Sequence, residues 1–238
     1  VSFFKGTKER GVLFDNLVNV LRKNSNFAST FFKKIDLEQI PPSTIQKNLQ
    51  EKLSDMPFLN EVFLEVLVKE KKISDDKFHT GLATHYVKQM FEKRRKDVLN
   101  DPFPKGGQTS PDENYINDYR KKFNDFLKDP TAKYSPESIL SQIKDSWLVD
   151  EEIFLYGVIK QHGEALNKLL GSFKYDKAEK YCEEKQEKLL TKLFELYIKN
   201  YNQYNRNLET RPDDTQLVRK RDELKKVIHN FLKKYAGH

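Results

Sequence analysis

Residues 155–182, LYGVIKQHGEALNKLLGSFKYDKAEKYC, decide the fold, although they first suggest a catalytic centre. They hold a histidine, carboxylates and Cys182, the one cysteine of the chain. However, Ala178, Tyr181 and Cys182 are spaced i, i+3 and i+4, so they share one face of a helix. A nucleophilic cysteine needs thiolate character from a nearby base or a helix N-terminus, and this spacing supplies neither. We therefore interpret Cys182 as a buried structural residue.

His162 and Gly163 fall between two apolar segments with helical spacing, residues 151–161 and 164–171. A histidine near a helix C-terminus interacts favourably with the last carbonyl groups, and a glycine readily takes the left-handed conformation that ends a helix. We expect this arrangement here, with a structural histidine rather than a catalytic one.

The sequence predicts no catalytic, cofactor-binding or metal site. Asp76 and His79 are three residues apart on one helix, but His85 falls on a different face and no matching set repeats on a partner helix. The glycine patterns of phosphate loops and dinucleotide sites are absent. An enzyme ranks behind the other interpretations for this reason.

Composition favours a folded helical protein. Of the 238 residues, 33% are charged and 37% are hydrophobic, with only 9 glycines and 9 prolines. A single cysteine excludes an internal disulfide, and we expect a reducing compartment such as the cytoplasm. No apolar run approaches the roughly 20 residues that span a bilayer, and no signal peptide precedes the first helix. Because the chain starts at Val1, we expect a fragment of a larger protein.

Serine and proline residues mark several expected helix starts. The capping signals are Ser43 with Gln46, Ser110 with Pro111 and Glu113, Ser135 with Pro136, and acidic pairs at 75–76 and 213–214. Two polar segments, residues 100–110 and 202–212, are predicted as exposed, flexible loops.

Apolar residues recur at helical spacing in four stripes. These are Phe78, Leu82, Tyr86, Met90 and Phe91; Tyr115, Tyr119, Phe123, Phe126 and Leu127; Leu189, Leu193, Phe194, Tyr197 and Tyr201; and Leu217, Leu224, Ile228, Phe231 and Tyr235. No stretch alternates with a period of two, so we predict an all-α protein of about eleven helices. Stacked antiparallel helix pairs or a compact bundle would both satisfy this pattern.

The net charge of +7 has two interpretations. Because 43 bases are interspersed with 36 acids, the simpler one is a set of solvated helix faces. The other is a basic surface for an anionic membrane or an acidic partner, formed by the runs at 92–96 and 218–226 through Arg94, Arg95, Lys96, Arg219, Lys220 and Arg221. In the second run, the basic side chains scatter around the helix and two acids, Asp222 and Glu223, dilute them, which argues against nucleic acid.

The same residues resemble a known family. Within 155–182, the pattern is similar to the clathrin-repeat-like segment of the Vam/Vps thirty-nine and TGF-beta-receptor-associated protein family, with matches at His162, Ala165, Leu166, Asp176, Ala178, Tyr181 and Cys182. Upstream, FLEVL (63–67), KFHTGLATHYV (77–87) and FNDFLKDPTAKYSPESIL (123–140) resemble further family elements. The resemblance covers residues 36–201 and leaves residues 202–238 as a flexible loop and a final amphipathic helix.

The resemblance implies that residues 1–238 are a single α-solenoid fragment of a HOPS or CORVET tethering subunit. Such complexes bridge endosomal, vacuolar or lysosomal membranes before SNARE-mediated fusion and work with Rab GTPases. The expected role is a non-enzymatic scaffold, cytoplasmic and peripheral on these membranes. Its expected partners are other tethering subunits, with a Rab GTPase bound through other parts of the parent protein. The alternative is a helical module that binds an anionic membrane or an acidic partner.

Overall fold

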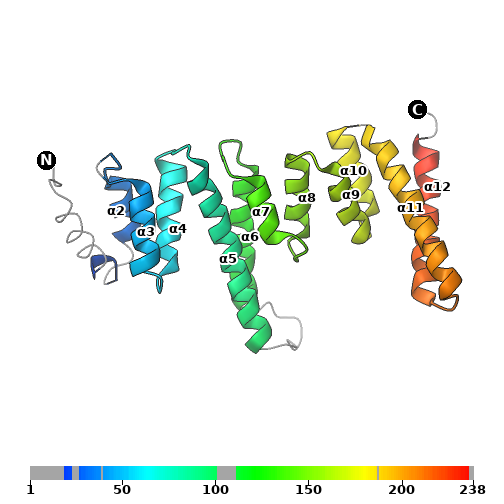
Figure 1. Cartoon of the computed structure of the whole chain (residues 1–238), viewed down its shortest axis with the longest axis horizontal. Helices are drawn as coiled ribbons and strands as arrows, with labels where there is room; N and C mark the ends of the chain where they lie inside the picture. Colours follow the sequence, from blue (N-terminus) through cyan, green and yellow to red (C-terminus); the bar gives the residue numbers. More distant parts are fainter. Residues whose placement is uncertain (1–18, 23–26, 39, 101–110, 187, 236–238) are drawn as a thin grey trace. The chain divides into compact units, whose positions relative to one another are not determined.

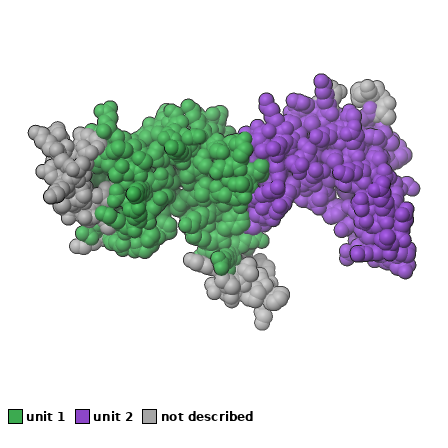
Figure 2. All heavy atoms as spheres, viewed as in Figure 1, with its two compact units in different colours: residues 1–142 green, residues 143–238 purple. Residues whose placement is uncertain are grey.

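The computed structural model describes residues 19–22, 27–38, 40–100, 111–186 and 188–235. Within these ranges it contains the eleven α-helices α2 to α12, a short helical piece at residues 19–22, one π-helical turn and no strand (Figure 1). The prediction of an all-α protein with about eleven helices is confirmed. The chain divides into two compact units, residues 1–142 and 143–238, which Figure 2 shows in different colours.

Unit 1 is built from helices that pack on their neighbours along the chain. They are α2 (Ala28–Lys34), α3 (Pro42–Lys52), α4 (Pro57–Glu65), the π-helical turn η2 (Val66–Glu70), α5 (Asp76–Asn100), α6 (Pro111–Lys128) and most of α7 (Pro136–Ile143). Helices α2 and α3 both contact α4, and α5 contacts α4, η2 and α6. Hydrogen bonds from Ser135 N to Thr80 Oγ1 (2.9 Å) and from Gln142 Nε2 to Thr84 Oγ1 (3.0 Å) attach α7 and its start to α5.

Unit 2 repeats this sequential packing. Its helices are α8 (Val149–Val158), α9 (His162–Gly171), α10 (Tyr175–Lys185), α11 (Lys188–Thr210) and α12 (Thr215–Tyr235). Each contacts the next along the chain, and α9 also contacts α11. Short turns between α8, α9 and α10 make these neighbours antiparallel, as in the helix pairs of a solenoid.

The predicted apolar stripes contribute to the cores of both units. In unit 1, Leu82, Tyr86 and Met90 of α5 and Phe123 of α6 are fully buried. Phe32 and Phe63, which lie outside the predicted stripes, are also fully buried, with ring centroids 5.1 Å apart. In unit 2, Phe231 of α12 packs against Phe194 and Tyr197 of α11 at 5.7 and 5.6 Å. Burying an aromatic side chain of this size stabilises the folded state by about 1.5 to 3 kcal/mol, so the stripes supply much of the packing energy.

Two successive turns in unit 2 have the same conformation. Beyond the end of α8, Lys160 has a φ of 60° and Gln161 N donates to Tyr156 O (2.9 Å). Beyond the end of α9, Phe173 has a φ of 55° and Lys174 N donates to Leu169 O (2.9 Å). This is the Schellman arrangement, which satisfies the last carbonyl groups of a helix. The left-handed residue is therefore Lys160, and the prediction that Gly163 ends the helix and His162 lies at its C-terminus is wrong. Both residues lie in the first turn of α9.

The helix starts agree with the sequence signals in part. Ser135 Oγ accepts from Ser138 N (3.2 Å), as predicted, and Asp214 Oδ1 caps α12 by accepting from Gln216 N and Leu217 N (3.1 and 3.0 Å). The predicted cap at Ser43 is wrong, because α3 starts at Pro42, whose fixed φ suits the first helical position. Helix α6 starts at Pro111 as expected, while Ser110 lies outside the described residues.

One predicted loop is helical. Residues 202–210 continue α11, and only residues 211–214 separate it from α12, so the predicted break at 202–212 is wrong at its start. Tyr201 and Tyr204 are half-buried, which keeps this polar stretch on the helix. The other predicted loop falls on residues 101–110, outside the described residues, after α5 has ended at Asn100.

The π-helical turn η2 follows α4 directly. Lys71 N donates to Val66 O (2.9 Å) across five residues, and Lys72 then takes a φ of 51°. The wider winding directs both Val66 and Leu67 into the core, where they are 4% and 0% exposed.

Among the helices that the structure describes, none is both long enough and apolar enough to cross a membrane.

Candidate functional site

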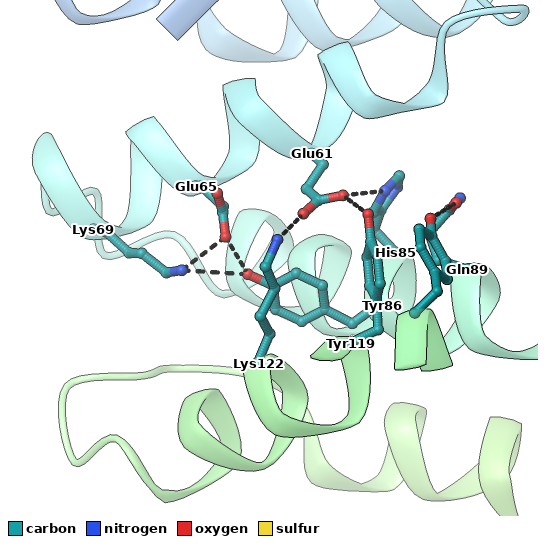
Figure 3. A network of polar contacts seen from close by, with 9 residues as sticks. Glu61, Glu65, Lys69, His85, Tyr86, Gln89, Tyr119 and Lys122 are labelled. Carbon is teal, nitrogen blue, oxygen red and sulfur yellow. Dashed lines mark hydrogen bonds and ion pairs between the residues drawn. The ribbon is translucent and has the colours of Figure 1, made fainter. Parts of the chain in front are cut away.

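The most distinctive feature of the described residues is a partly buried polar network formed by side chains of α4, η2, α5 and α6 (Figure 3). We call it the α4–α6 network, and its members are Glu61, Glu65, Lys69, His85, Tyr86, Gln89, Tyr115, Tyr119 and Lys122. Three of them, Tyr86, Tyr115 and Tyr119, belong to the apolar stripes that the sequence predicts.

Glu61 is the centre of the network. It lies on α4 and is 5% exposed. Its Oε1 accepts a hydrogen bond from Lys122 Nζ (2.6 Å), and its Oε2 accepts one from the Tyr119 hydroxyl. His85 Nε2 lies 3.3 Å from the same Oε2. One carboxylate of α4 therefore contacts α5 and α6 together, as Figure 3 shows.

These contacts determine the ionisation state of Glu61. Burial alone would raise the pKa of a carboxyl group, but the hydrogen bonds and charges from His85, Lys122 and Tyr119 outweigh it and lower the pKa of Glu61 to about 2. Burial alone would lower the pKa of Lys122. The hydrogen bond to Glu61 and the charge of Glu61 outweigh burial, so the pKa of Lys122 is raised. The two groups therefore form an ion pair throughout the neutral range.

A second carboxylate, Glu65, extends the network by one helical turn. Its Oε1 accepts from the Tyr86 hydroxyl (2.7 Å) and from Lys69 Nζ (2.8 Å). Burial, followed by the bond to Glu65, raises the pKa of Tyr86, so the hydroxyl stays protonated and donates.

Lys122 makes a second contact within the network. Its Nζ lies 5.0 Å from the centre of the Tyr119 ring, a favourable cation–π distance.

The chemistry of the α4–α6 network is that of a structural clamp. The carboxylates are engaged by donors from neighbouring side chains, and the tyrosines keep their protons because burial and carboxylate charges raise their pKa. Directional bonds of this kind fix how three helices align, which apolar contacts alone specify less strictly. We expect this clamp to set the register of α5 against α4 and α6.

Sequence reasoning placed Tyr86 and Tyr119 in apolar stripes but missed the network. A signal was present: Glu61 interrupts the apolar run of α4, and Lys122 follows Tyr119 by one turn of α6. A carboxylate inside an apolar helix generally needs a partner, since an unpaired buried charge is costly.

The stretch 155–182 forms a second, mostly apolar contact region between α8, α9 and α10. His162 Nδ1 lies 2.8 Å from the Tyr181 hydroxyl. Ala165, Leu166, Ala178 and Cys182 are each fully buried, while Asp176 is exposed in the first turn of α10.

Cys182 has the properties of a packing residue. Burial, followed by the charges of Glu179 and Glu183, raises the pKa of its thiol to about 12. The side chain therefore stays a neutral thiol at physiological pH, which is unsuited to nucleophilic attack.

His79 and His85, which the sequence pattern did not favour as metal ligands, have other contacts. His79 Nδ1 accepts from Lys133 N (3.2 Å), so its Nε2 carries the proton and donates to Ile73 O (2.8 Å). His85 faces Glu61. Across the described part of the chain, no group of three or more His, Cys, Asp or Glu residues is placed to hold a metal ion.

The predicted basic residues fall in two different units. Arg94 and Arg95 are exposed on α5, and the side chain of Lys96 lies outside the described residues. On α12, Arg219 is exposed, Lys220 Nζ lies 5.1 Å from the centre of the Phe173 ring, and Arg221 donates to Asp222 (2.7 Å). Lys220 and Arg221 are therefore already engaged within unit 2.

Comparison with known proteins gives one informative match. No family model matches the chain, and no solved structure matches it significantly. The chain is 31% identical over 123 residues to the transforming growth factor-beta receptor-associated protein 1 homolog of Danio rerio. The match covers 51% of this chain but only 13% of that protein. This all-helical chain is thus a distant and partial homologue of a TGF-beta-receptor-associated protein, the kind of protein that residues 155–182 resemble.

Proposed function

We propose that the chain is a non-enzymatic scaffold segment of a membrane-tethering subunit of the HOPS or CORVET type. The observation that carries the proposal is the similarity to the TGF-beta receptor-associated protein 1 homolog, which falls on a chain of helices that pack one after another. Because the match spans a small part of that protein, the parent's complex and membrane belong to the proposal as well.

The mechanism is mechanical rather than chemical. Each helix buries its apolar stripe on its neighbours, so displacing one helix exposes the next. Within unit 1, the α4–α6 network adds hydrogen bonds between three helices. Such a segment would hold other tethering subunits at a fixed spacing, on the cytoplasmic side of endosomal, vacuolar or lysosomal membranes. A Rab GTPase would be bound by other parts of the parent protein.

Binding to purified partners tests the proposal. The chain is immobilised and exposed separately to individual HOPS and CORVET subunits and to Rab GTPases in both nucleotide states. We expect at least one tethering subunit to be retained and the Rab GTPases to pass through. A Leu166→Asp variant, which disrupts the core of unit 2, serves as the control for contacts that need folded helices. Retention of no tethering subunit would contradict the proposal.

Vesicle sedimentation separates the scaffold from the alternative, a module that adsorbs to anionic membranes through its basic runs. Phosphatidylserine vesicles are mixed with the chain and with a variant carrying Arg94→Gln, Arg95→Gln and Arg219→Gln. A scaffold is expected to remain in the supernatant in both cases. Adsorption that the variant loses, and that rising salt abolishes, would favour the alternative.

A further inference from the structure

The charges of three lysines in unit 2 act on His162. Lys160 lies in the turn before α9, Lys185 at the end of α10, and Lys192 in the first turns of α11. All three are exposed, and within the described residues none forms an ion pair. By contrast, Lys168, Lys174, Lys177 and Lys180 of the same helices each have an acidic partner.

The glycines of this region show how closely the lysines approach. A β-carbon placed on Gly163 would lie 2.8 Å from Lys192 Nζ and 3.1 Å from its Cε. One placed on Gly157 would lie 3.8 Å from Lys185 Cε and 3.1 Å from the Tyr181 hydroxyl. Both glycines therefore leave room for a lysine side chain against α8 and α9.

The charge at the start of α9 is unusual for a helix N-terminus. The first turn of a helix presents unpaired N–H groups and a partial positive charge, which favour a nearby anion. No side chain caps α9, whose N-cap is Gln161, and the ammonium group of Lys192 lies beside its second residue. The acidic residue of this turn is Glu164. It is exposed, and its charge is one of the causes that raise the pKa of Tyr156.

The charges of the three lysines also affect the imidazole of His162. Burial, followed by the charges of Lys185, Lys192 and Lys160, lowers the pKa of His162. Its Nδ1 is occupied by the Tyr181 hydroxyl at 2.8 Å. The pKa of His162 therefore responds to changes in charge near the start of α9.

We propose that Lys160, Lys185 and Lys192, together with the uncapped start of α9, bind a compact phosphate-bearing anion. Lysine is a common point-charge ligand for phosphate, and a helix N-terminus provides N–H donors for the same group. Convergence of three cations on one place suits a small, highly charged group better than an extended acidic peptide, which needs a row of positive charges. The proposal does not depend on the tethering role.

Histidine NMR tests the site directly. The pKa of His162, assigned with a His162→Gln variant, is measured in the full chain at constant ionic strength with chloride, inorganic phosphate or inositol trisphosphate. We expect the phosphate ligands to raise this pKa by about half a unit or more relative to chloride, because a bound anion offsets the lysine charges. An unchanged pKa with both phosphate ligands would overturn the proposal.

Two sets of variants distinguish a site from diffuse charge. Replacing Lys160, Lys185 and Lys192 by glutamine should abolish the phosphate response. Replacing Lys199, Lys225 and Lys226, which removes the same charge elsewhere in unit 2, should preserve it. Equal loss in both triple variants would contradict a localised site. Gly163→Ala is a further probe, since alanine favours the helix but would displace Lys192, so affinity should fall while thermal stability holds or rises.

The source of the phosphate group is resolved with three probes. Inorganic phosphate, soluble inositol trisphosphate, and phosphatidylcholine vesicles with and without a phosphoinositide are compared. Binding to the phosphoinositide vesicles that inositol trisphosphate competes away indicates a lipid headgroup, whereas binding of the soluble anions alone indicates a free ligand. Binding of a phosphopeptide without any response to these three probes would overturn the proposal.

Discussion

Two buried tyrosines differ in what their hydroxyl groups contact. The Tyr86 hydroxyl donates to Glu65 at 2.7 Å, whereas the Tyr197 hydroxyl is buried and has no hydrogen-bond partner in the described residues. Both rings are fully buried. A buried donor without a partner loses its hydration and gains nothing in return.

Removing the two hydroxyl groups should therefore have opposite effects. We expect Tyr197→Phe to raise the free energy of unfolding by about 1 kcal/mol, and Tyr86→Phe to lower it by about 1 to 2 kcal/mol. Urea denaturation followed by circular dichroism measures both, with each variant as the matched control for the other. Equal losses in the two variants would show that the Tyr197 hydroxyl has a partner.

Glu61 should make stability depend on pH in the acid range. Its pKa in the folded state is about 2, against an ordinary value of 4.5. A lowered pKa contributes stability that is fully present above the unfolded value and is lost as pH falls through the folded value. At pH 7 we expect Glu61→Gln to cost about 3 kcal/mol. The difference from the unmodified chain should shrink between pH 4.5 and 2.

Denaturant titrations of both proteins at several pH values check this expectation. Glu65→Gln, which makes the same substitution at a neighbouring carboxylate of the network, is measured alongside for comparison. A stability difference between Glu61→Gln and the unmodified chain that stays constant down to pH 2 would count against a depressed pKa.

At the residue scale, the sequence predicted burial better than it predicted polar contacts. The helical spacing placed Leu82, Tyr86 and Phe123 in the core, where the structure has them. It could not pair Glu61 with Tyr119 and Lys122, because a hydrogen bond joining residues about sixty positions apart depends on how the helices pack. Periodicity describes one helix at a time.

At the scale of elements, the turns of unit 2 show what holds consecutive helices together. Leu148, Gln161 and Lys174, which precede α8, α9 and α10, have nearly the same backbone angles (φ −83°, −85° and −92°; ψ 52°, 56° and 59°). The left-handed residue of the α8–α9 turn, Lys160, is not glycine and is exposed. A residue with a side chain bears a steric cost of about 1 to 2 kcal/mol in this conformation.

Glycine at position 160 should relieve this cost. We expect Lys160→Gly to raise the free energy of unfolding by about 0.5 to 1 kcal/mol, because the flexibility of glycine in the unfolded chain offsets part of the gain. Lys160→Ala removes the same charge and keeps the strain, so it is the control. Thermal denaturation compares the two, and a less stable glycine variant would mean that the turn is not left-handed in solution.

The sequence predicted the existence of helices more reliably than their ends. Ser135 caps α7 as expected, but Pro42 displaces the start of α3 from Ser43. The stretch 202–210 has loop-like composition, yet it is helical because α11 continues against α12. Local propensity is a weak signal where a neighbouring helix supplies the packing.

At the scale of the whole molecule, division into two units implies local unfolding. In a chain whose helices contact mainly their neighbours, stability is a sum of local terms, so a defect need not spread. The α4–α6 network lies in unit 1, whereas Leu166 and Ala178 lie in unit 2. Both residues are fully buried.

Damage to the core of unit 2 should therefore remain in unit 2. We expect Leu166→Asp, which buries a charge, to abolish amide protection in α8 to α11 at a cost of several kcal/mol, and Ala178→Trp to act similarly through overpacking. Protection in α4 to α6 should persist. Hydrogen exchange with mass spectrometry measures both regions, and loss of protection in both units would show that they unfold as one.

The overall architecture was the most predictable level. Helical spacing alone left a solenoid and a bundle open, and the family resemblance of residues 155–182 favoured the solenoid. The sequential contacts within each unit agree with stacked helix pairs. A single solenoid over residues 1–238 remains a prediction, since helical periodicity holds no information on how separate units are joined.

The wide winding of η2 also bears on how this protein tolerates changes in length. A π-helical turn holds one residue more than the α-helical turn it replaces. Deleting one residue within Val66–Glu70 would let the backbone rewind into an ordinary α-helix, with the flanking segments α4 and α5 keeping their faces. Elsewhere in α4 or α5, the same deletion would rotate every later side chain by about 100° and detach it from its neighbours. Single-residue deletions in unit 1 that leave it folded are therefore expected within η2.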